Sequence, residues 1–203
     1  MNIVVIIAII TIVVSIMGFR QEGLFYKLQL NPWLVVHKKE YHRILTHALL
    51  HADWGHLIIN MIVFFSFGDG LLKFFNYYFE ASGSIIFLML YVFSIMVSSI
   101  YSIIKNKDNS NYNAIGASGA VSAIVFANIF FDPWHKIYLF GIVAIPGILF
   151  GLFYLGYSYY MGKKAQDNIG HDAHFWGAVF GLIFPLLIKP ELINHFTNQL
   201  LGY

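Results

Sequence analysis

The chain has 203 residues, of which 59% are hydrophobic and only 11% are charged. These are about 120 apolar residues, enough for roughly six helical membrane crossings of about 20 residues each, and they exclude a water-soluble globular domain. A net charge of +2 without a basic cluster excludes nucleic-acid binding, and the lack of cysteine excludes disulfides, thiolate metal sites and thiol nucleophiles.

The first predicted element is an apolar run over residues 3–19, which we interpret as a retained membrane span. No basic residue precedes this run and no small-residue cleavage site follows it, as a removed signal peptide would require. Residues 20–55 are too polar to cross a membrane and too apolar to be disordered. They predict a structured first loop that lies on the membrane.

Five further apolar runs follow the first loop, and none alternates with the period of two that a barrel strand requires. Helices satisfy their own backbone groups in lipid. The expected fold is therefore all-α, one polytopic domain over residues 1–203 with six transmembrane helices. The five later spans are expected at about residues 56–75, 84–104, 116–131, 137–161 and 173–188.

Small residues recur at four-residue spacing in two of these spans. They are Gly119, Ala123 and Ala127 in the fourth span and Gly177 and Gly181 in the sixth. This spacing lets helix backbones approach closely where lipid supplies no hydrophobic drive, so it predicts close helix packing.

Polar side chains lie in the first turns of spans two, four and six, which begin at the same membrane face if the spans alternate in direction. They are His56 and Asn60 in span two, Ser118 in span four and His174 in span six. His56 and Asn60 are four residues apart and so share one side of their helix. We therefore expect the four side chains to converge at one depth below one surface.

This set of side chains is suited to acyl transfer. A serine hydroxyl becomes an effective nucleophile when a neutral imidazole takes its proton, and Ser118 and His174 supply that pair. His56, Asn60 and backbone N–H groups near Ser118 supply donors for the oxyanion of a tetrahedral intermediate. The alternative interpretation is structural, with a packing motif around Ser118 and interhelical hydrogen bonds from the other three side chains.

Four short motifs, taken in their order and placement, resemble the rhomboid family of intramembrane serine proteases. They are His47-Ala-Leu-Leu-His51, His56-Leu-Ile-Ile-Asn60, Gly116-Ala-Ser118-Gly119 and the run from Ala173-His174 through Gly177 to Gly181. The resemblance runs from about Glu40 to Gly181, and the six expected spans extend it over the whole chain.

The resemblance implies a catalytic dyad of Ser118 and His174 without a third carboxylate, and an oxyanion hole formed by His56, Asn60 and Ser118. It implies hydrolysis of peptide bonds in or near transmembrane segments, with single-pass membrane proteins as substrates and the lipid bilayer as the medium. It implies no metal and no cofactor.

The resemblance also implies a membrane-inserted first loop in which Arg43 and Glu40 brace one another. It further implies that Gly177 and Gly181 of span six form the contact that brings this span against span four. The loop motif of the family usually reads Trp-Arg, whereas this chain has His42-Arg43. The anchoring aromatic is therefore missing or replaced, with Tyr41 as the candidate.

A second departure lies four residues after the serine, where many family members carry an aromatic that packs on the base. This chain has Ser122 there, so the orientation of His174 must come from elsewhere, with Trp176 as the candidate. Asp172 lies two residues before the base and so points to another side of the helix, which argues against a triad.

Positive charge is distributed unevenly between the two predicted faces. The face of the site carries Arg20, Lys27, Lys38, Lys39, Arg43, Lys105, Lys107, Lys163 and Lys164, and the other carries Lys73, Lys136 and Lys189. By the positive-inside rule, the face with more Lys and Arg lies in the cytoplasm, and this face carries the site. The resemblance places it on the extracytoplasmic side of the cell membrane, and we adopt that orientation because much of the first loop is expected to pack into the protein.

Two other functions stay open. One is an inactive rhomboid-like protein that binds transmembrane clients, although such relatives lose the serine or the histidine and this chain keeps both. The more remote one is a membrane di-iron oxidase that uses the pairs His47/His51 and His171/His174, although those enzymes need adjacent histidines that are absent here. The histidines expected to be solvated are His37, His135 and His195.

Overall fold

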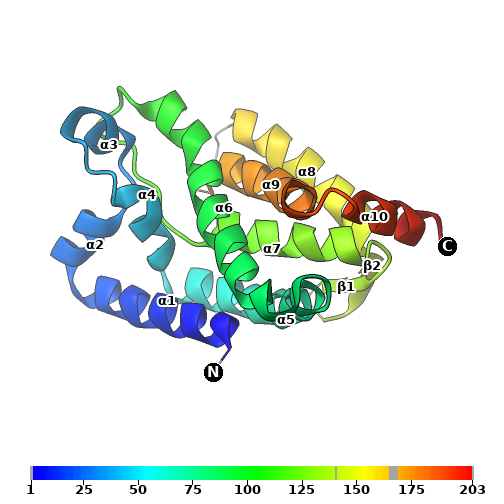
Figure 1. The fold of residues 1–203 in the computed structure, drawn as a ribbon. Coiled ribbons are helices and arrows are strands. Elements are labelled where there is room, and N and C mark those ends of the chain that lie inside the picture. Colours follow the sequence, from blue (N-terminus) through cyan, green and yellow to red (C-terminus); the bar gives the residue numbers. More distant parts are fainter. Residues whose placement is uncertain (1, 140, 165–168, 203) are drawn as a thin grey trace.

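The computed structural model describes residues 2–139, 141–164 and 169–202 (Figure 1). The α-helices are α1 (Ile3–Arg20), α2 (Glu22–Leu28), α3 (Pro32–Lys38), α4 (Arg43–Thr46), α5 (Trp54–Phe79), α6 (Gly83–Asn106), α7 (Ser118–Phe131), α8 (Gly147–Lys164), α9 (His171–Ile188) and α10 (Leu192–Leu201). Two 3₁₀ helices, η1 (His47–Leu49) and η2 (Glu80–Ser82), and two strands, β1 (Lys136–Leu139) and β2 (Val143–Pro146), complete the described elements. Residues 165–168 of the predicted connection between the fifth and sixth spans lie outside the described residues.

Helices α1, α5, α6, α7, α8 and α9 lie where the sequence predicts spans. Within the described chain, three segments are long and apolar enough to cross a membrane: Ile3–Arg20, Trp54–Asn106, which contains both α5 and α6, and His171–Ile188. Helix α7 is apolar but has only 14 residues. The apolar helices indicate a multi-pass membrane protein, and the number of six crossings stays a prediction.

The predicted fifth span is wrong over its first part, and the fold is therefore not entirely α-helical. The chain forms an antiparallel hairpin in which Lys136 pairs with Pro146 and Leu139 pairs with Val143, and α8 begins only after it. The turn contains Gly141 with φ +72°, a conformation that glycine adopts readily. Aromatic and β-branched side chains flank this turn and favour strands, but strands of four residues are too short to show a clear period.

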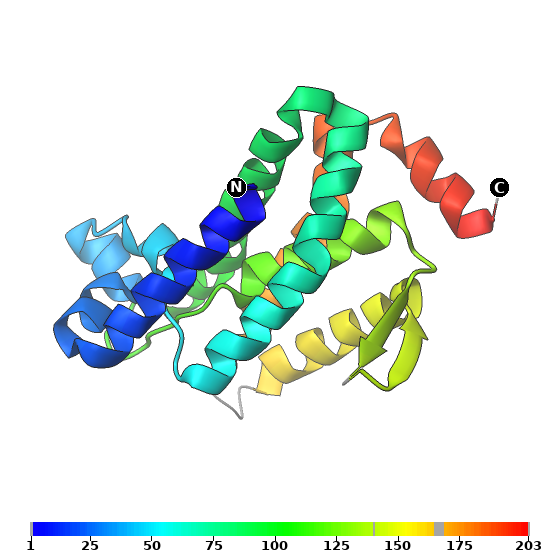
Figure 2. The same cartoon turned by 90° about the horizontal axis from the view of Figure 1, so that it is seen from below.

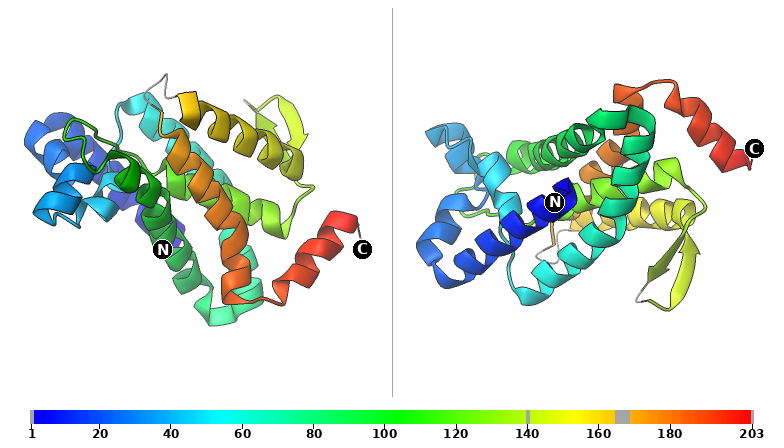
Figure 3. Two further views of the ribbon diagram at one scale, coloured as in Figure 1. Left: turned by 90° about the horizontal axis from the view of Figure 1, so that it is seen from above. Right: turned by 60° about the horizontal axis from the view of Figure 1, so that its bottom comes forward.

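Helix α7 lies in the interior of the bundle, against α5, α6, α8 and α9. Twelve of its 14 residues are buried, which is expected for a helix that is apolar on all sides. Figures 2 and 3 show α9 beside α7 and α8, with the hairpin at one end of α8. The short buried helix thus begins, with Ser118, among the ends of its longer neighbours.

The contact between α7 and α9 depends on the glycines of the sixth predicted span. A Cβ atom at Gly177 would overlap the backbone carbonyl of Gly119, and one at Gly181 would overlap the carbonyl of Ala123. Backbone can approach backbone this closely only where no side chain intervenes. The predicted close packing of these two helices is confirmed.

The first loop folds into α2, α3, α4 and η1, which lie together beside the end of α1 (Figure 1). Arg43 is buried, and its Nε donates to the Glu40 carboxylate at 2.7 Å. Its Nη1 donates to the backbone carbonyls of Tyr26 at 2.6 Å and Gln29 at 2.8 Å. The predicted brace between Arg43 and Glu40 is confirmed, and it also fixes the end of α2.

His42, which stands where the family usually has the loop tryptophan, makes a hydrogen bond to the backbone. Its Nε2 lies 3.2 Å from the carbonyl oxygen of Lys27, which ties α4 to the end of α2. Tyr41 is 58% exposed and packs little against the protein, so its role as an anchor of the loop in the membrane stays a prediction. A hydrogen bond to backbone replaces an apolar anchor at this corner.

No element is expected from the sequence after the sixth span, but residues Leu192–Leu201 form α10. Phe196 stacks on Phe130 with ring centroids 5.1 Å apart. The ring nitrogens of His195 lie 2.9 Å from the Tyr78 hydroxyl and 2.9 Å from the Phe131 carbonyl oxygen. The prediction that His195 is solvated is wrong, because α10 packs back on the end of α7.

Candidate active site

All four predicted site residues lie in the first two turns of helices. Ser118 is the first residue of α7, His174 the fourth of α9 and His56 the third of α5, with Asn60 one turn further along α5. The boundaries of these helices thus place each side chain where the sequence predicts it.

The first turns of α7 and α9 touch at residues adjacent to Ser118 and His174. A Cβ atom at Gly119 would lie 3.3 Å from the carbonyl oxygen of Ala173. Gly119 follows Ser118, and Ala173 precedes His174. Because neither Gly119 nor Gly177 has a side chain, the two helix ends approach closely at the depth of both predicted dyad members.

His56 and Ser118 border one small space next to Gly116. A Cβ atom at Gly116 would lie 2.9 Å from Cε1 and 3.1 Å from Nε2 of His56, and 3.9 Å from the Ser118 Oγ. Gly116 has φ +111°, a conformation that strains any residue with a side chain. The glycine therefore shapes the turn before α7 and keeps the space between the imidazole and the hydroxyl open.

The surroundings of His56 determine which ring nitrogen carries its proton. The backbone N–H of Ala52 donates to Nδ1 of His56 at 3.4 Å, so Nδ1 is an acceptor. A neutral imidazole then has its proton on Nε2, the nitrogen that lies beside Gly116. The ring is thus arranged to donate a hydrogen bond into the space that borders Ser118.

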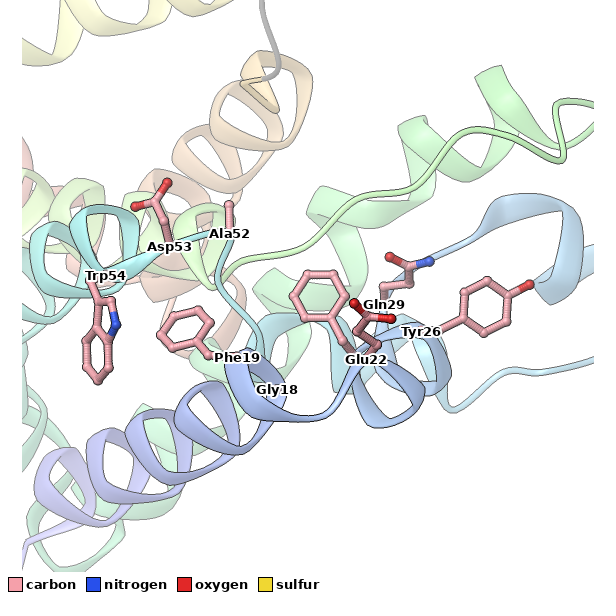
Figure 4. Close-up of a pocket in the computed structure, with 9 residues that line it drawn as sticks. Gly18, Phe19, Glu22, Tyr26, Gln29, Ala52, Asp53 and Trp54 are labelled. Atoms are coloured by element: carbon pink, nitrogen blue, oxygen red, sulfur yellow. The ribbon is translucent and has the colours of Figure 1, made fainter.

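Residues that precede α5 also border a cavity of about 450 Å³ at the junction of α1, α2 and α5 (Figure 4). Asp53 caps α5 by accepting from the backbone N–H of His56 at 2.8 Å. The rings of Trp54 and Phe19 pack with centroids 5.1 Å apart. This cavity lies beside the segment that holds His56 and includes none of the four predicted site residues.

Asn60 is buried and has a partner within its own helix. Its amide nitrogen donates to the carbonyl oxygen of His56 at 3.0 Å. An amide nitrogen carries two hydrogens, so this bond uses one of them and fixes the plane of the group. The bond lies within α5 and is therefore not the interhelical hydrogen bond of the structural interpretation, and it leaves donor capacity for a ligand.

The N-terminus of α7 contributes backbone donors next to the Ser118 hydroxyl. N–H groups in the first turn of a helix have no carbonyl acceptor within the helix. The residue at the cap position is Ala117, whose side chain cannot accept from them. These N–H groups and the positive end of the helix dipole favour negative charge beside Ser118.

The aromatic ring found beside His174 comes from Tyr154 of α8, with centroids 6.3 Å apart and planes inclined by 28°. Trp176, the predicted substitute, lies against Tyr101 of α6 at 6.4 Å. Asp172 pairs with Lys105 of α6 at 3.0 Å, in agreement with the argument against a triad. Sequence reasoning missed Tyr154 because a contact between two helices follows no sequence period.

Two buried histidines of the first loop, His47 and His51, contact residues that border the site. The His47 carbonyl accepts from the N–H of Gly116 at 3.0 Å. The His51 ring meets His56 edge-on at 4.9 Å, and its Nδ1 lies 2.9 Å from the Ser15 hydroxyl. Burial lowers the pKa of His47 to about 4 and the pKa of His51 to about 3, so both rings are neutral near pH 7.

Comparison with known proteins identifies the family of this chain. The sequence profile of the Rhomboid domain matches residues 38–191. RHOMBOID-like protein 12, mitochondrial, of Arabidopsis thaliana is 30% identical over 150 residues, which cover 70% of this chain and 45% of that protein. Rhomboid-related protein 1 of Caenorhabditis elegans is 26% identical over 168 residues, which cover 79% of this chain and 44% of that protein. The chain thus spans less than half the length of either relative, and it belongs to the rhomboid family.

Proposed function

We propose that this chain is an intramembrane serine protease that hydrolyses peptide bonds in or near transmembrane segments through a dyad of Ser118 and His174. The observation that carries the proposal is the glycine contact between α7 and α9, which joins the two helix ends one residue away from each dyad member. If this contact served helix packing alone, no polar side chains would be needed beside it. Here a hydroxyl and two imidazoles lie there.

In this proposal the Ser118 hydroxyl attacks the scissile carbonyl carbon while His174 takes its proton. The oxyanion accepts hydrogen bonds from Nε2–H of His56, from the Asn60 amide and from the backbone N–H of Ser118. His174 then gives the proton to the leaving amine. A water molecule, deprotonated by the same imidazole, hydrolyses the acyl-enzyme and restores the serine.

A large apolar cavity supports a membrane-embedded substrate. It has a volume of about 1390 Å³ and is lined by α5, α7, α8 and the hairpin. On α5 it extends from Ile59, next to Asn60, as far as Tyr78, and Ile59 and Ile62 are well exposed. We propose that a single-pass transmembrane segment enters between α5 and α8 and reaches Ser118 from this side.

We further propose that the protein acts in the cell membrane with its site on the extracytoplasmic side. The mitochondrial relative makes an organellar membrane the alternative. An inactive protein that binds transmembrane clients is the second candidate function. The di-iron alternative lacks support in the described part of the chain, where no group of three or more His, Asp or Glu side chains is arranged to hold a metal ion.

The test uses the purified full chain in detergent with a panel of single-pass substrates. Wild-type protein is expected to cleave at least one of them, and Ser118→Ala and His174→Ala are expected to abolish cleavage. Ser84→Ala and His37→Ala are matched controls, because both residues are exposed and lie away from the site. Cleavage that persists in Ser118→Ala excludes the assigned nucleophile.

A fluorophosphonate probe separates the two candidate functions. It is expected to label Ser118 in wild-type protein and not in His174→Ala, because labelling requires the activated hydroxyl. A wild-type protein that captures transmembrane substrates but neither cleaves them nor reacts with the probe supports the inactive binding protein.

A further inference from the structure

The Tyr154 ring, which lies beside His174, has three further contacts that hold it in place. The hydroxyl of Tyr154 lies 2.6 Å from the Ser122 hydroxyl on α7. The Tyr154 ring also packs against Phe126 of α7 and Phe150 of α8, with centroids 5.6 Å away in both cases. An aromatic ring with a fixed polar end and two aromatic neighbours has little freedom to rotate.

The two residues that form this arrangement depend on each other. Ser122 is buried and lies one helical turn after Ser118, on the element that carries the proposed nucleophile. Its small side chain leaves room for the Tyr154 ring, and its hydroxyl binds the hydroxyl at the end of that ring. An aromatic residue at position 122 would compete with Tyr154 for the same space.

His174 is enclosed by two rings of different orientation. Tyr154 stacks on it at an inclination of 28°, and His171 meets it edge-on with centroids 6.0 Å apart. Offset-stacked and edge-on contacts are the favourable geometries for such pairs. Together they restrict the rotation of the imidazole about its side-chain bonds, which a general base needs in order to remain aimed at one hydroxyl.

We propose that Tyr154 is a positioning residue for His174 and that Ser122 fixes Tyr154, so that the aromatic support of the base comes from α8 rather than from α7. This inference rests on the proposed role of His174 as the general base. It assigns Tyr154 no contact with the substrate and no proton transfer.

The test compares kcat and KM for variants of the purified full chain. Tyr154→Leu removes the ring and is expected to lower kcat roughly tenfold, a loss of about 1.4 kcal/mol, while KM stays the same. Tyr154→Phe keeps the ring but removes its bond to the Ser122 hydroxyl, and it is expected to lower kcat by a smaller factor than Tyr154→Leu. Tyr160→Leu is the matched control, because Tyr160 lies on the same helix and is 55% exposed.

An exchange variant distinguishes positioning from stability. Ser122→Tyr together with Tyr154→Ser moves the ring to α7 and the small hydroxyl to α8. It is expected to recover kcat relative to Tyr154→Leu, and the rate of fluorophosphonate labelling of Ser118 is expected to recover with it. Recovery of the unfolding temperature without recovery of kcat overturns the inference, because Tyr154 would then act through packing alone.

The outcomes separate this inference from the proposed function. If wild-type protein cleaves, Ser118→Ala does not, and Tyr154→Leu keeps the wild-type kcat, only the positioning role fails. A drop in kcat that is the same for Tyr154→Phe and Tyr154→Leu also overturns it, because the hydroxyl and not the ring would then matter. A wild-type protein without cleavage or labelling overturns both.

Discussion

The contact between α7 and α9 leads to a quantitative prediction for Gly177→Ala. A Cβ atom at this position would overlap the Gly119 carbonyl oxygen and would lie 2.8 Å from its carbonyl carbon and 3.1 Å from its Cα. Carbon atoms in contact are ordinarily about 3.5–4.0 Å apart. The atoms to be displaced belong to backbone, so α9 has to move away from α7 by roughly 1 Å.

Two consequences of this movement have different sizes. Overpacking of a well-packed contact costs about 1–3 kcal/mol of unfolding free energy. A displacement of about 1 Å between reacting groups can lower a rate on the order of 100-fold. Gly177→Ala is therefore expected to lose far more activity than stability, because the strained contact lies within a turn of both Ser118 and His174.

The assay measures kcat/KM for a cleaved substrate together with thermal unfolding in detergent. Gly156→Ala on α8 is the control, since no atom beyond the neighbouring residues and backbone of its own helix lies within 4 Å of the position of its added Cβ. Both variants gain the same helix propensity, so their difference isolates the contact. A Gly177→Ala protein with the activity and unfolding temperature of Gly156→Ala would refute the argument.

Three further predictions concern the first loop and the chemistry. Arg43→Lys is expected to lower the unfolding free energy by about 2–3 kcal/mol, measured by denaturant titration in detergent, because an ammonium cannot reach three acceptors held by one planar guanidinium. The buried His47 and His51 contribute stability that is complete above pH 6.5 and is lost as the pH falls toward 4 and 3, since the unfolded chain binds their protons first. Unfolding temperatures that do not change between pH 7 and pH 4 would contradict this, and His47→Asn should flatten the dependence. A chelator is expected to leave cleavage unchanged, and strong inhibition that iron reverses would favour the di-iron alternative.

The positions of the site residues could be predicted because few physical rules determine them. Lipid requires helices, and helices that alternate in direction place the starts of every second one at the same face. This was sufficient to place His56, Ser118 and His174 in first turns, and the spacing of small residues was sufficient to predict the contact of α7 with α9. The ion pair of Arg43 with Glu40 followed from family resemblance rather than from any period.

Other features depend on contacts that no local pattern encodes. The aromatic ring beside His174 comes from Tyr154 of α8, whereas many family members supply it from the position of Ser122 on α7. Which of the two helices supplies the ring depends on how their side chains pack together, and neither helix shows this in its own sequence. The hairpin before α8 has strands too short for a periodic signal, and its apolar side chains suit a buried helix equally well. Helix α10 was missed because its stability depends on Phe196 and His195 packing against the end of α7.

The orientation in the membrane can be tested because both chain ends lie on one side of the molecule. Near the N-terminus, Asn2 donates to Asp69 at 3.0 Å, in the half of α5 away from His56. At the other end, α10 packs on Phe130 and Phe131 at the end of α7 away from Ser118. With the six crossings expected from the sequence, both ends lie at one face of the membrane, so tags at the two ends are expected to respond alike to protease added to intact cells. In the extracytoplasmic orientation of the site both tags are protected. Digestion of both tags would place the site on the cytoplasmic side, as the positive-inside rule predicts. Digestion of only one tag would contradict the placement of the two ends in this fold.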